Sequence, residues 1–329
     1  MRIPRIGISL GDPGGIGPEI ILKSISGDTS LPEAAYVVFG DAWVLENEAK
    51  RLGIKTELSR WREETGPSAP GLFFHDVRTP LTKVGAGSAA KENGEASFLY
   101  FEAAVEKAKR GALDGLVTAP ISKSSWDLAG FRWRGHTEYL EQVYPGAIMT
   151  FWSELLNVAL LSHHLPLWEA LGKIRKDVLL GFLRGLHAAL ERARPGRCEL
   201  LMAGLNPHAG EEGLMGMEEI REIMPAIAAA RSEGIRVSGP CPPDTVFFKA
   251  LDRADTVVVA LYHDQGLIAF KTVAFESGVN ATLGMPFIRT SPDHGTAFDI
   301  AGKGVASARS MIAAIALAHE FVRSTVDSG

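Results

Sequence analysis

Three short polar segments that carry histidine lie at the ends of strand-like apolar runs. SHHLP, GLNPHAGE and YHDQG follow the runs predicted as strands over 157–164, 198–205 and 255–262. Ligands bind at the carboxyl ends of strands in open α/β sheets, where the loops converge. Three imidazoles with one open coordination position are a known arrangement for a catalytic divalent ion. The pattern therefore predicts a metal site, for which hydrolysis fits as well as redox chemistry.

One histidine of the first segment has to be chosen. His163 and His164 are adjacent, so in an extended chain their side chains point to opposite faces. At most one of the two can aim at a site shared with His208 and His263.

Two glycine-rich segments favour a phosphate or nucleotide ligand. GDPGGIGPEI (11–20) follows the first strand-like run and opens a helix, whose N-terminus favours an anion. In DHGTAFDIAGKG (293–304), small residues around Thr296 would let a flat ring lie on the backbone, and Asp299 can accept from ribose hydroxyls. GAGSAA (85–90) has the spacing of a dinucleotide fingerprint but lacks the acidic residue about 20 positions on. We interpret it as a loop that enters a helix.

Strand-like runs alternate with helical patterns along almost the whole chain. Further strands are predicted over 5–10, 34–40, 71–76 and 114–120, and helices over 95–112, 176–194, 217–234 and 305–324. The gaps between strands have the length of crossovers, which indicates an α/β protein with a mainly parallel sheet. No linker marks a boundary, so a domain can be discontinuous.

The composition excludes several classes of protein. The chain has 329 residues, of which 46% are hydrophobic, and a formal net charge of −5, so it lacks the basic surface of a nucleic-acid-binding protein. No apolar stretch approaches the ~18 residues of a membrane span. Cys198 and Cys241 have no metal or disulfide spacing. We expect a soluble protein of the reducing cytoplasm.

Taken together, the motifs resemble a known enzyme family. GDPGGIGPE and HGTAFDIAGK are similar to the turn and the nucleotide loop of the isocitrate and isopropylmalate dehydrogenase superfamily. TAPISK, GHTEYL, SHHLPL, GLNPHAGE, GPCPPDTVF, YHDQGLIAFK and GVNATLGMPFIRTSPDHGTA follow one another along the chain. In that order they resemble the 4-hydroxythreonine-4-phosphate dehydrogenase family of vitamin B6 biosynthesis.

The resemblance implies a three-layer α/β fold of two subdomains with the site in the cleft between them. One lobe, about 1–125 plus 275–329, would bind NAD. The other, about 126–274, would carry the metal ligands and the interface of a homodimer. One metal histidine would come from the partner, so the active site would be shared.

Roles for single residues also follow from the resemblance. It implies that the metal ligands are His164, His208 and His263. The substrate would contact His136, Thr137, Lys271, Asn280 and Arg289. The dinucleotide would contact Gly295, Thr296, Asp299 and Gly302. The general base stays open among Lys271, Asp244 and Asp264.

The implied reaction is the NAD-dependent oxidation of 4-phosphooxy-threonine at C3. Its product, 2-amino-3-oxo-4-phosphooxybutanoate, decarboxylates to 3-amino-2-oxopropyl phosphate in pyridoxal 5'-phosphate biosynthesis. The cofactors would be NAD, or NADP, and a zinc, magnesium or cobalt ion. Alternatives are a dehydrogenase of threonate or erythronate phosphate, a dehydrogenase of an aromatic cis-dihydrodiol, and a three-histidine metal hydrolase.

Overall fold

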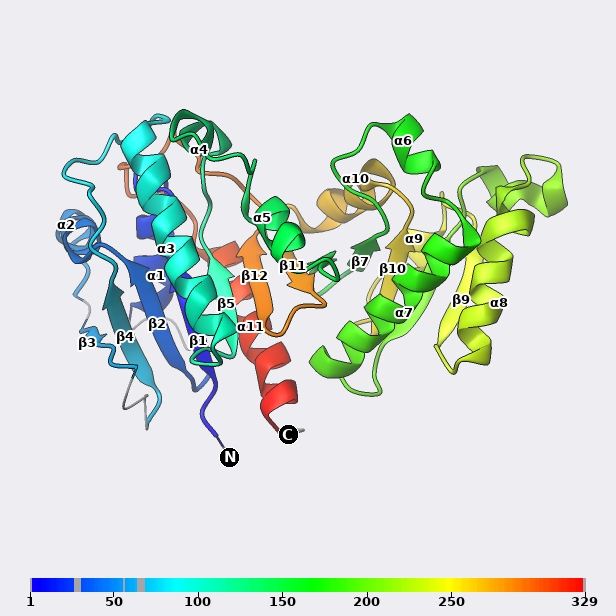
Figure 1. Ribbon diagram of the computed structural model, residues 1–329, viewed down its shortest axis with the longest axis horizontal. Helices are drawn as coiled ribbons and strands as arrows, with labels where there is room; N and C mark the ends of the chain where they lie inside the picture. The colour runs from blue at the N-terminus through cyan, green and yellow to red at the C-terminus, as the bar shows by residue number, and fades with distance from the viewer. Residues whose placement is uncertain (1, 27–30, 56, 64–68, 328–329) are drawn as a thin grey trace. The chain divides into compact units, whose positions relative to one another are not determined.

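The chain divides into two compact units, one of them discontinuous. The computed structural model describes residues 2–26, 31–55, 57–63 and 69–327. The first unit joins Met1–Pro145 with Pro286–Gly329, and the second is Gly146–Met285 (Figure 1). The sequence placed the boundaries near 125 and 275, whereas the units in the structure join at 145 and 285. Strands alternate with helices in both units, so the α/β class is confirmed.

All strand pairs of the first unit are parallel. The strand order is β3-β4-β2-β1-β5-β12 (Figure 1). The strands are β1 (Arg5–Ser9), β2 (Ala35–Gly40), β3 (Ser59–Arg60), β4 (Gly71–Asp76), β5 (Gly115–Thr118) and β12 (Ile288–Pro292). Every residue of β2, β5 and β12 is buried. Because successive side chains point to opposite faces, both faces of the sheet are covered, as the apolar runs predict.

Helices cover this sheet. They are α1 (Gly17–Ile25), α2 (Ala42–Leu52), α3 (Lys91–Lys109), α4 (Lys123–Leu128), α5 (His136–Val143) and α11 (Arg309–Asp327). Helix α3 packs on β1 and β2, and α11 packs on β5 and β12. GAGSAA precedes α3, in agreement with its interpretation as a helix-entry loop. Among the helices that the structure describes, none combines the length and the apolar character needed to cross a membrane.

The second unit has a mixed sheet in the order β11-β6-β7-β10-β8-β9. Its strands are β6 (Ile148–Trp152), β7 (Asn157–Leu160), β8 (Glu199–Ala203), β9 (Val237–Cys241), β10 (Thr256–Ala260) and β11 (Val279–Leu283). The pairs β11–β6 and β6–β7 are antiparallel. Strand β10 pairs in parallel with both β7 and β8, so the carboxyl ends of these three strands lie at one edge.

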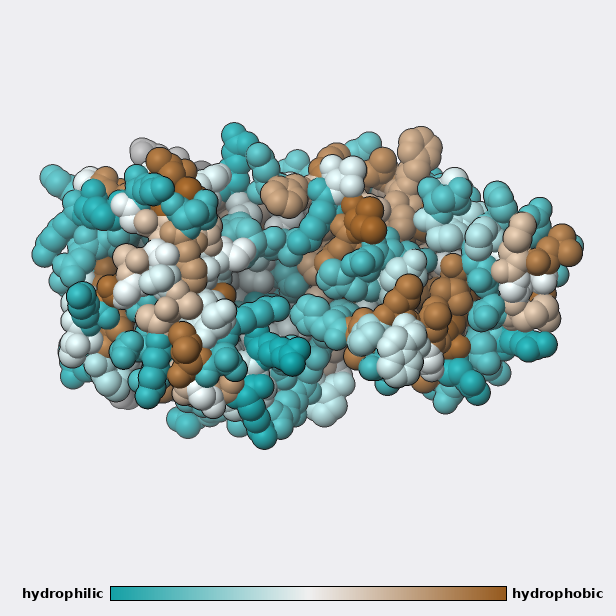
Figure 2. All heavy atoms as spheres, turned by 90° about the horizontal axis from the view of Figure 1, so that it is seen from above, coloured by the Kyte–Doolittle hydropathy of each residue, from teal (hydrophilic) through white to brown (hydrophobic). Residues whose placement is uncertain are grey.

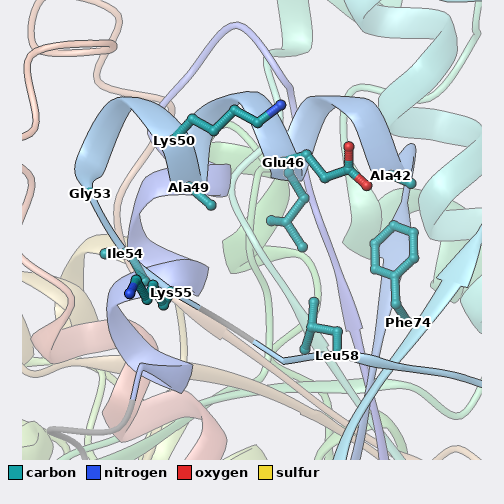
Figure 3. A pocket seen from close by; sticks show the side chains of 10 residues that line it. Ala42, Glu46, Ala49, Lys50, Gly53, Ile54, Lys55, Leu58 and Phe74 are labelled. Atoms are coloured by element: carbon teal, nitrogen blue, oxygen red, sulfur yellow. The ribbon is translucent and has the colours of Figure 1, made fainter.

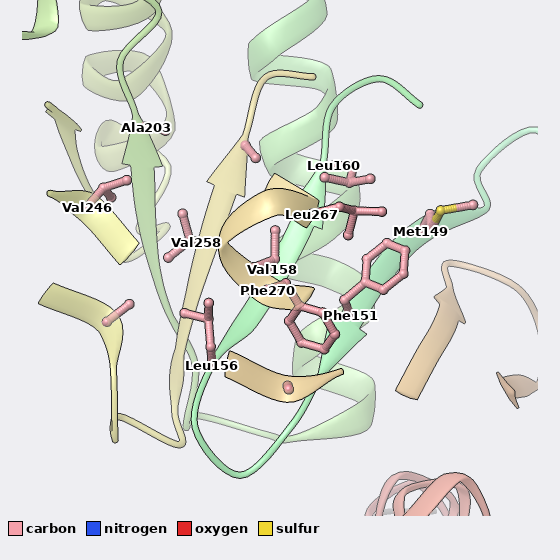
Figure 4. Packing of buried hydrophobic residues seen from close by; sticks show 13 residues of the cluster. Met149, Phe151, Leu156, Val158, Leu160, Ala203, Val246, Val258, Leu267 and Phe270 are labelled. Carbon is pink, nitrogen blue, oxygen red and sulfur yellow. The ribbon is translucent and has the colours of Figure 1, made fainter. Parts of the chain in front are cut away.

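Buried side chains fix the helix that follows β10. The helices of the second unit are α6 (Leu167–Leu171), α7 (Lys176–Ala193), α8 (Met224–Ser232), α9 (Val246–Ala250) and α10 (His263–Ala274). Leu267 and Phe270 of α10 pack with Val158 and Phe151 in a buried cluster, where the Phe270 and Phe151 ring centres are 5.5 Å apart (Figure 4). Each buried side chain of this size contributes about 1.5–3 kcal/mol. These contacts hold α10, and with it His263 at its start, against the sheet of the second unit.

Candidate active site

The structure brings two of the three predicted metal ligands together. His164 follows β7, and His263 is the first residue of α10 after β10. Their ring centres are 6.0 Å apart, and both side chains line a cavity of about 260 Å³ with Tyr262 and Asp264. The His163 ring packs edge-on against His164 at 5.1 Å. His164 is thus the member of the adjacent pair that faces His263 and this cavity.

The geometry at His263 suits an imidazole that binds a metal ion. Its Nδ1 lies 2.7 Å from Oδ1 of Asp264. A carboxylate on one ring nitrogen orients the imidazole and leaves the other nitrogen, here Nε2, as the ligand atom. Two imidazoles bound to one zinc ion have ring centres about 5 Å apart, given a Zn–N distance of about 2.0–2.1 Å. The observed 6.0 Å is close to that value, so the pair fits a divalent ion. Asp264 is the carboxylate that would orient His263 toward such an ion.

The third predicted ligand, His208, does not join this pair within one chain. Among residues 2–26, 31–55, 57–63 and 69–327, no three His, Cys, Asp or Glu side chains are grouped so that they could hold an ion. His208 is exposed in the turn Pro207–Gly213 that follows β8. The ligation of an ion by all three histidines therefore stays a prediction.

The turn that carries His208 has an unusual backbone. The five consecutive residues from His208 to Glu212 have positive φ values between 41° and 81°. Only Gly210 among them is glycine. A left-handed conformation costs roughly 1–2 kcal/mol for each non-glycine residue. Strain of this kind persists only where surrounding contacts hold it, and it clusters at functional sites.

A second set of candidate residues forms a buried cluster in the first unit. Arg289 of β12 is only 4% exposed. Its Nε and Nη2 donate hydrogen bonds of 3.0 and 2.7 Å to Oγ1 of Thr118, at the end of β5. Burial lowers the pKa of Arg289 to about 9, so its guanidinium is still cationic at neutral pH. The sequence analysis gave Thr118 no role, although it lies in the quoted motif TAPISK at the end of a predicted strand.

His136 completes this cluster as a neutral side chain. Its ring packs on Phe101 at 4.4 Å, and burial, assisted by the charge of Arg289, lowers the pKa of His136 well below 6.5. Nη2 of Arg289 lies 3.3 Å from Nδ1 of His136, and because a guanidinium can only donate, the imidazole proton belongs on Nε2. Within the described part of the chain, this buried Nε2 has no hydrogen-bond partner. A buried donor in that position fits a ligand oxygen.

His136 and Thr137 begin α5, so the first backbone N–H groups of that helix lie beside the Arg289 cluster. The N-terminus of a helix favours an anion. A cation, a neutral donor and helix N–H groups together suit a phosphate or a carboxylate.

The two glycine-rich segments singled out by sequence are in contact. The N–H of Ile16 donates to the carbonyl of Thr296 at 3.0 Å. A Cβ on Gly15 would lie 2.9 Å from the Cβ of Thr296, so only glycine permits this approach. Asp12 supports the turn by accepting from the N–H of Gly14 at 2.9 Å, and burial raises the pKa of Asp12.

Charged side chains hold the second half of the predicted nucleotide loop. Glu19 of α1, 1% exposed, accepts from the N–H of Ala306 and from Lys23 Nζ, both at 2.8 Å. Lys23 also donates to the carbonyls of Gly304 and Ala306, and Arg51 Nη1 donates to the carbonyl of Gly302 at 2.7 Å. Gly295, near the start of the loop, and Asp299, near its middle, are exposed.

The remaining predicted residues do not line the cavity beside His164 and His263. Lys271 lies in the last turn of α10, about 12 Å along the helix axis from His263 at 1.5 Å per residue. The sequence analysis did not foresee this helix. Asp244 is exposed before α9, and Asn280 lies in β11. Of the three candidate bases, only Asp264 lines the cavity.

A separate cavity of about 600 Å³ contains none of the predicted site residues. It lies beside α2 and Gly53–Lys55, with Leu45, Leu58 and Phe74 as apolar lining and Lys50 and Lys55 beside them (Figure 3). Nothing in its lining connects it with the histidines or with the nucleotide loop.

Comparisons with known proteins confirm the resemblance. The profile of the family described as "Pyridoxal phosphate biosynthetic protein PdxA" matches residues 32–318. A 4-hydroxythreonine-4-phosphate dehydrogenase of Aquifex aeolicus is 40% identical over 97% of this chain and 98% of its own length. A D-threonate 4-phosphate dehydrogenase of Salmonella typhimurium is also 40% identical, over 97% of this chain and 99% of its own.

A solved structure agrees with these sequence relatives. The crystal structure of a 4-hydroxythreonine-4-phosphate dehydrogenase from Klebsiella pneumoniae matches with a TM-score of 0.85 and 37% identity, over 97% of this chain and 99% of that one. With the family profile spanning most of the sequence and full-length relatives at 40% identity, the chain belongs to the PdxA family of pyridoxal phosphate biosynthetic proteins.

Proposed function

We propose that the chain oxidises 4-hydroxy-L-threonine 4-phosphate at C3, with NAD as hydride acceptor, in vitamin B6 biosynthesis. The observation that carries the proposal is the buried cluster of Arg289, Thr118 and His136 in a member of this family. Arg289 would pair with an anionic group of the substrate, and Nε2–H of His136 would donate to an oxygen of the same group. A neutral imidazole adds a hydrogen bond without a second buried positive charge.

His164 and His263 would hold a divalent ion near the reacting carbon. When bound, such an ion supplies Lewis-acid stabilisation of negative charge on the C3 oxygen, which both oxidation and decarboxylation require. Asp264 keeps His263 oriented through the 2.7 Å contact to Nδ1.

NAD would bind at the loop 293–304. The contact of Thr296 with Ile16 and Gly15 gives this loop a fixed backbone, and Lys23, Glu19 and Arg51 hold its second half. A preformed loop lowers the entropy cost of ordering the dinucleotide.

We further propose a homodimer in which His208 of one copy completes the ion site of the other. Both histidine segments continue into exposed apolar residues, and hydrophobic side chains reach the surface among hydrophilic ones (Figure 2). After His164 come Leu165, Leu167, Trp168 and Leu171; after His208 come Leu214, Met215, Met217 and Ile220. A second copy seated on these residues would cover apolar surface and bring its own His208 to the facing pair.

Mixing inactive variants tests the shared site. His208→Ala and His263→Ala homodimers should each be inactive. Their mixture should regain about one quarter of wild-type activity, because half of the dimers are mixed and each mixed dimer has one intact site of two. The control mixture of His164→Ala with His263→Ala should regain none, since both histidines belong to the same half of each site. Recovery in the control and not in the test mixture would refute this assignment of ligands.

The activity itself is tested by following NADH absorbance with the purified protein. We expect turnover of 4-hydroxythreonine 4-phosphate that stops on chelation and returns with a divalent ion. His208→Ala should abolish turnover while NAD binding remains nearly intact. Hydrolytic turnover without NAD would support the three-histidine hydrolase instead.

D-Threonate 4-phosphate is the second candidate substrate, because a relative with that activity in its name is equally identical to this chain. It has the same phosphate and carboxylate groups and carries a hydroxyl at C2 in place of the amino group. The ratio of the kcat/KM values for the two phosphates decides between them. A ratio in favour of the threonate would overturn the proposed substrate and leave the anion site and the ion site standing.

A further inference from the structure

Glu219 is a buried carboxylate outside every segment that the sequence analysis assigned to the site. It lies in the π-helical turn Glu219–Ile223 and is 1% exposed. We propose that Glu219 is a positioning residue that holds the His208 turn in its left-handed conformation, so that the imidazole is presented for metal binding. This inference rests on the proposed role of His208 as a ligand.

The contacts of Glu219 converge on the start of the His208 turn. Its Oε1 accepts from the backbone N–H groups of Leu205 and Asn206, both at 2.8 Å. Its Oε2 accepts from Nδ2 of Asn206, also at 2.8 Å. Three hydrogen bonds to one buried carboxylate thus fix the two residues that precede Pro207 and His208.

The turn is also shaped to receive this carboxylate. Gly210 has φ of 81°, and a Cβ there would lie 2.8 Å from Oε2 of Glu219, so the glycine lets the turn close against the acid. On the other side, Nε2 of Gln265 donates to the carbonyl of Gly204 at 2.8 Å, which ties the start of the turn to α10. Gln265 and Glu219 therefore brace the same segment from two elements.

A conformation with four left-handed non-glycine residues needs such bracing. Without the carboxylate, the N–H groups of Leu205 and Asn206 lose their acceptor and the turn can relax toward ordinary φ values. His208 would then lose its fixed direction while remaining in the chain. Residues that orient a metal ligand without touching the metal typically change metal affinity by 10–100-fold when removed.

The first test needs no metal. Amide hydrogen exchange at Leu205 and Asn206 should speed up at least about tenfold in Glu219→Ala and return toward wild-type rates in Glu219→Gln, whose side-chain oxygen can still accept. Glu218→Ala is the matched control, because Glu218 is exposed and its side chain bonds to Nδ2 of Asn206 and to the backbone at Met217 and Glu218. The N–H groups of Leu205 and Asn206 donate to Glu219 instead. Unchanged exchange in Glu219→Ala would overturn the proposal.

The second test measures Co²⁺ binding by calorimetry and by visible absorbance of the wild type and variants freed of metal. We expect Glu219→Ala to weaken Co²⁺ binding about 10–100-fold and Glu218→Ala to change it less than about threefold. In a His208→Ala background, Glu219→Ala should have no further effect, because Glu219 acts through that imidazole.

The outcomes separate this inference from the proposed function. An equal loss of Co²⁺ affinity with and without His208, or a loss of thermal stability at unchanged Co²⁺ affinity, would show a merely structural role and overturn the inference. A wild-type protein that binds no Co²⁺ would instead overturn the proposed ion site, and the positioning of a metal ligand with it.

Discussion

Replacing Glu19 by alanine should destabilise the protein by about 3 kcal/mol. Oε1 of Glu19 accepts from Lys23 Nζ and from the N–H of Ala306, both at 2.8 Å. A hydrogen bond to a charged group contributes about 1.5–3 kcal/mol, and breaking a buried pair costs about 3–5 kcal/mol. The Lys23 side chain is 27% exposed, so water recovers part of the loss at that end. The lower end of the range therefore applies.

Urea unfolding followed by tryptophan fluorescence measures this loss, and α3 supplies a matched control. Lys91 and Glu95 form an i,i+4 pair in the reverse order at 3.8 Å, with side chains 60% and 39% exposed. Glu95→Ala should cost less than about 0.5 kcal/mol, because an exposed pair is screened by water. Equal losses for the two variants would refute the reasoning that burial and the contact with Ala306 set the magnitude. If the loop binds NAD, Glu19→Ala should also raise the NAD dissociation constant, whereas Glu95→Ala should not.

Three further predictions follow from the geometry. Thr118→Val removes the acceptor of the 3.0 and 2.7 Å bonds from Arg289 and should cost about 2 kcal/mol, whereas Thr118→Ser should keep most of the stability; thermal unfolding compares them. The pKa of His136 is lower in the folded than in the unfolded protein, so the unfolded chain takes up the proton first as the pH falls below about 6.5. The free energy of unfolding should then fall by up to about 1.4 kcal/mol per pH unit because of this residue. His136→Gln should therefore make the stability curve shallower below that pH, and parallel curves for the two proteins would count against the burial of a neutral imidazole. Gly284 has φ of 79°, and a Cβ there would lie 2.0 Å from the carbonyl oxygen of Gly146, so Gly284→Ala should destabilise the protein by more than about 2 kcal/mol. Gly53 has φ of 67° but lies in open space, so Gly53→Ala should cost about 1 kcal/mol; urea unfolding measures both.

Some strands can be predicted from the sequence and others cannot, depending on how their side chains are buried. Continuous apolar runs such as 34–40 and 255–262 are readable because both faces of those strands are buried. Strand β12, IRTSP, was missed because its arginine and serine look exposed in sequence. Arg289 is buried there, and Thr118, far away in the chain, accepts hydrogen bonds from its guanidinium. When the hydrogen-bond partner of a buried polar side chain lies far away in the chain, the local sequence gives no sign that the side chain is buried.

The same distinction applies to the candidate site. The placement of histidines after strands was readable, but the proximity of His164 to His263 depends on β7 lying next to β10, and strand order is set by long-range pairing. The sequence analysis predicted no helix around Lys271, because HDQGLIAFK has no strong helix-start signal before it, whereas this residue lies in the last turn of α10. Glu219 was missed altogether. Two of its three hydrogen-bond partners are backbone N–H groups, which a sequence does not distinguish from one another.

The discontinuity of the first unit has a consequence for how the protein is made. β5 pairs with β12 and is covered by α11, and both of these elements leave the ribosome only after the entire Gly146–Met285 unit has been synthesised. The nascent first unit thus carries an unsealed strand edge and an uncovered apolar surface for most of translation, a condition that favours aggregation and chaperone engagement. The inserted unit is contiguous and can finish folding first. A premature stop near the C-terminus would therefore damage the half of the protein made earliest.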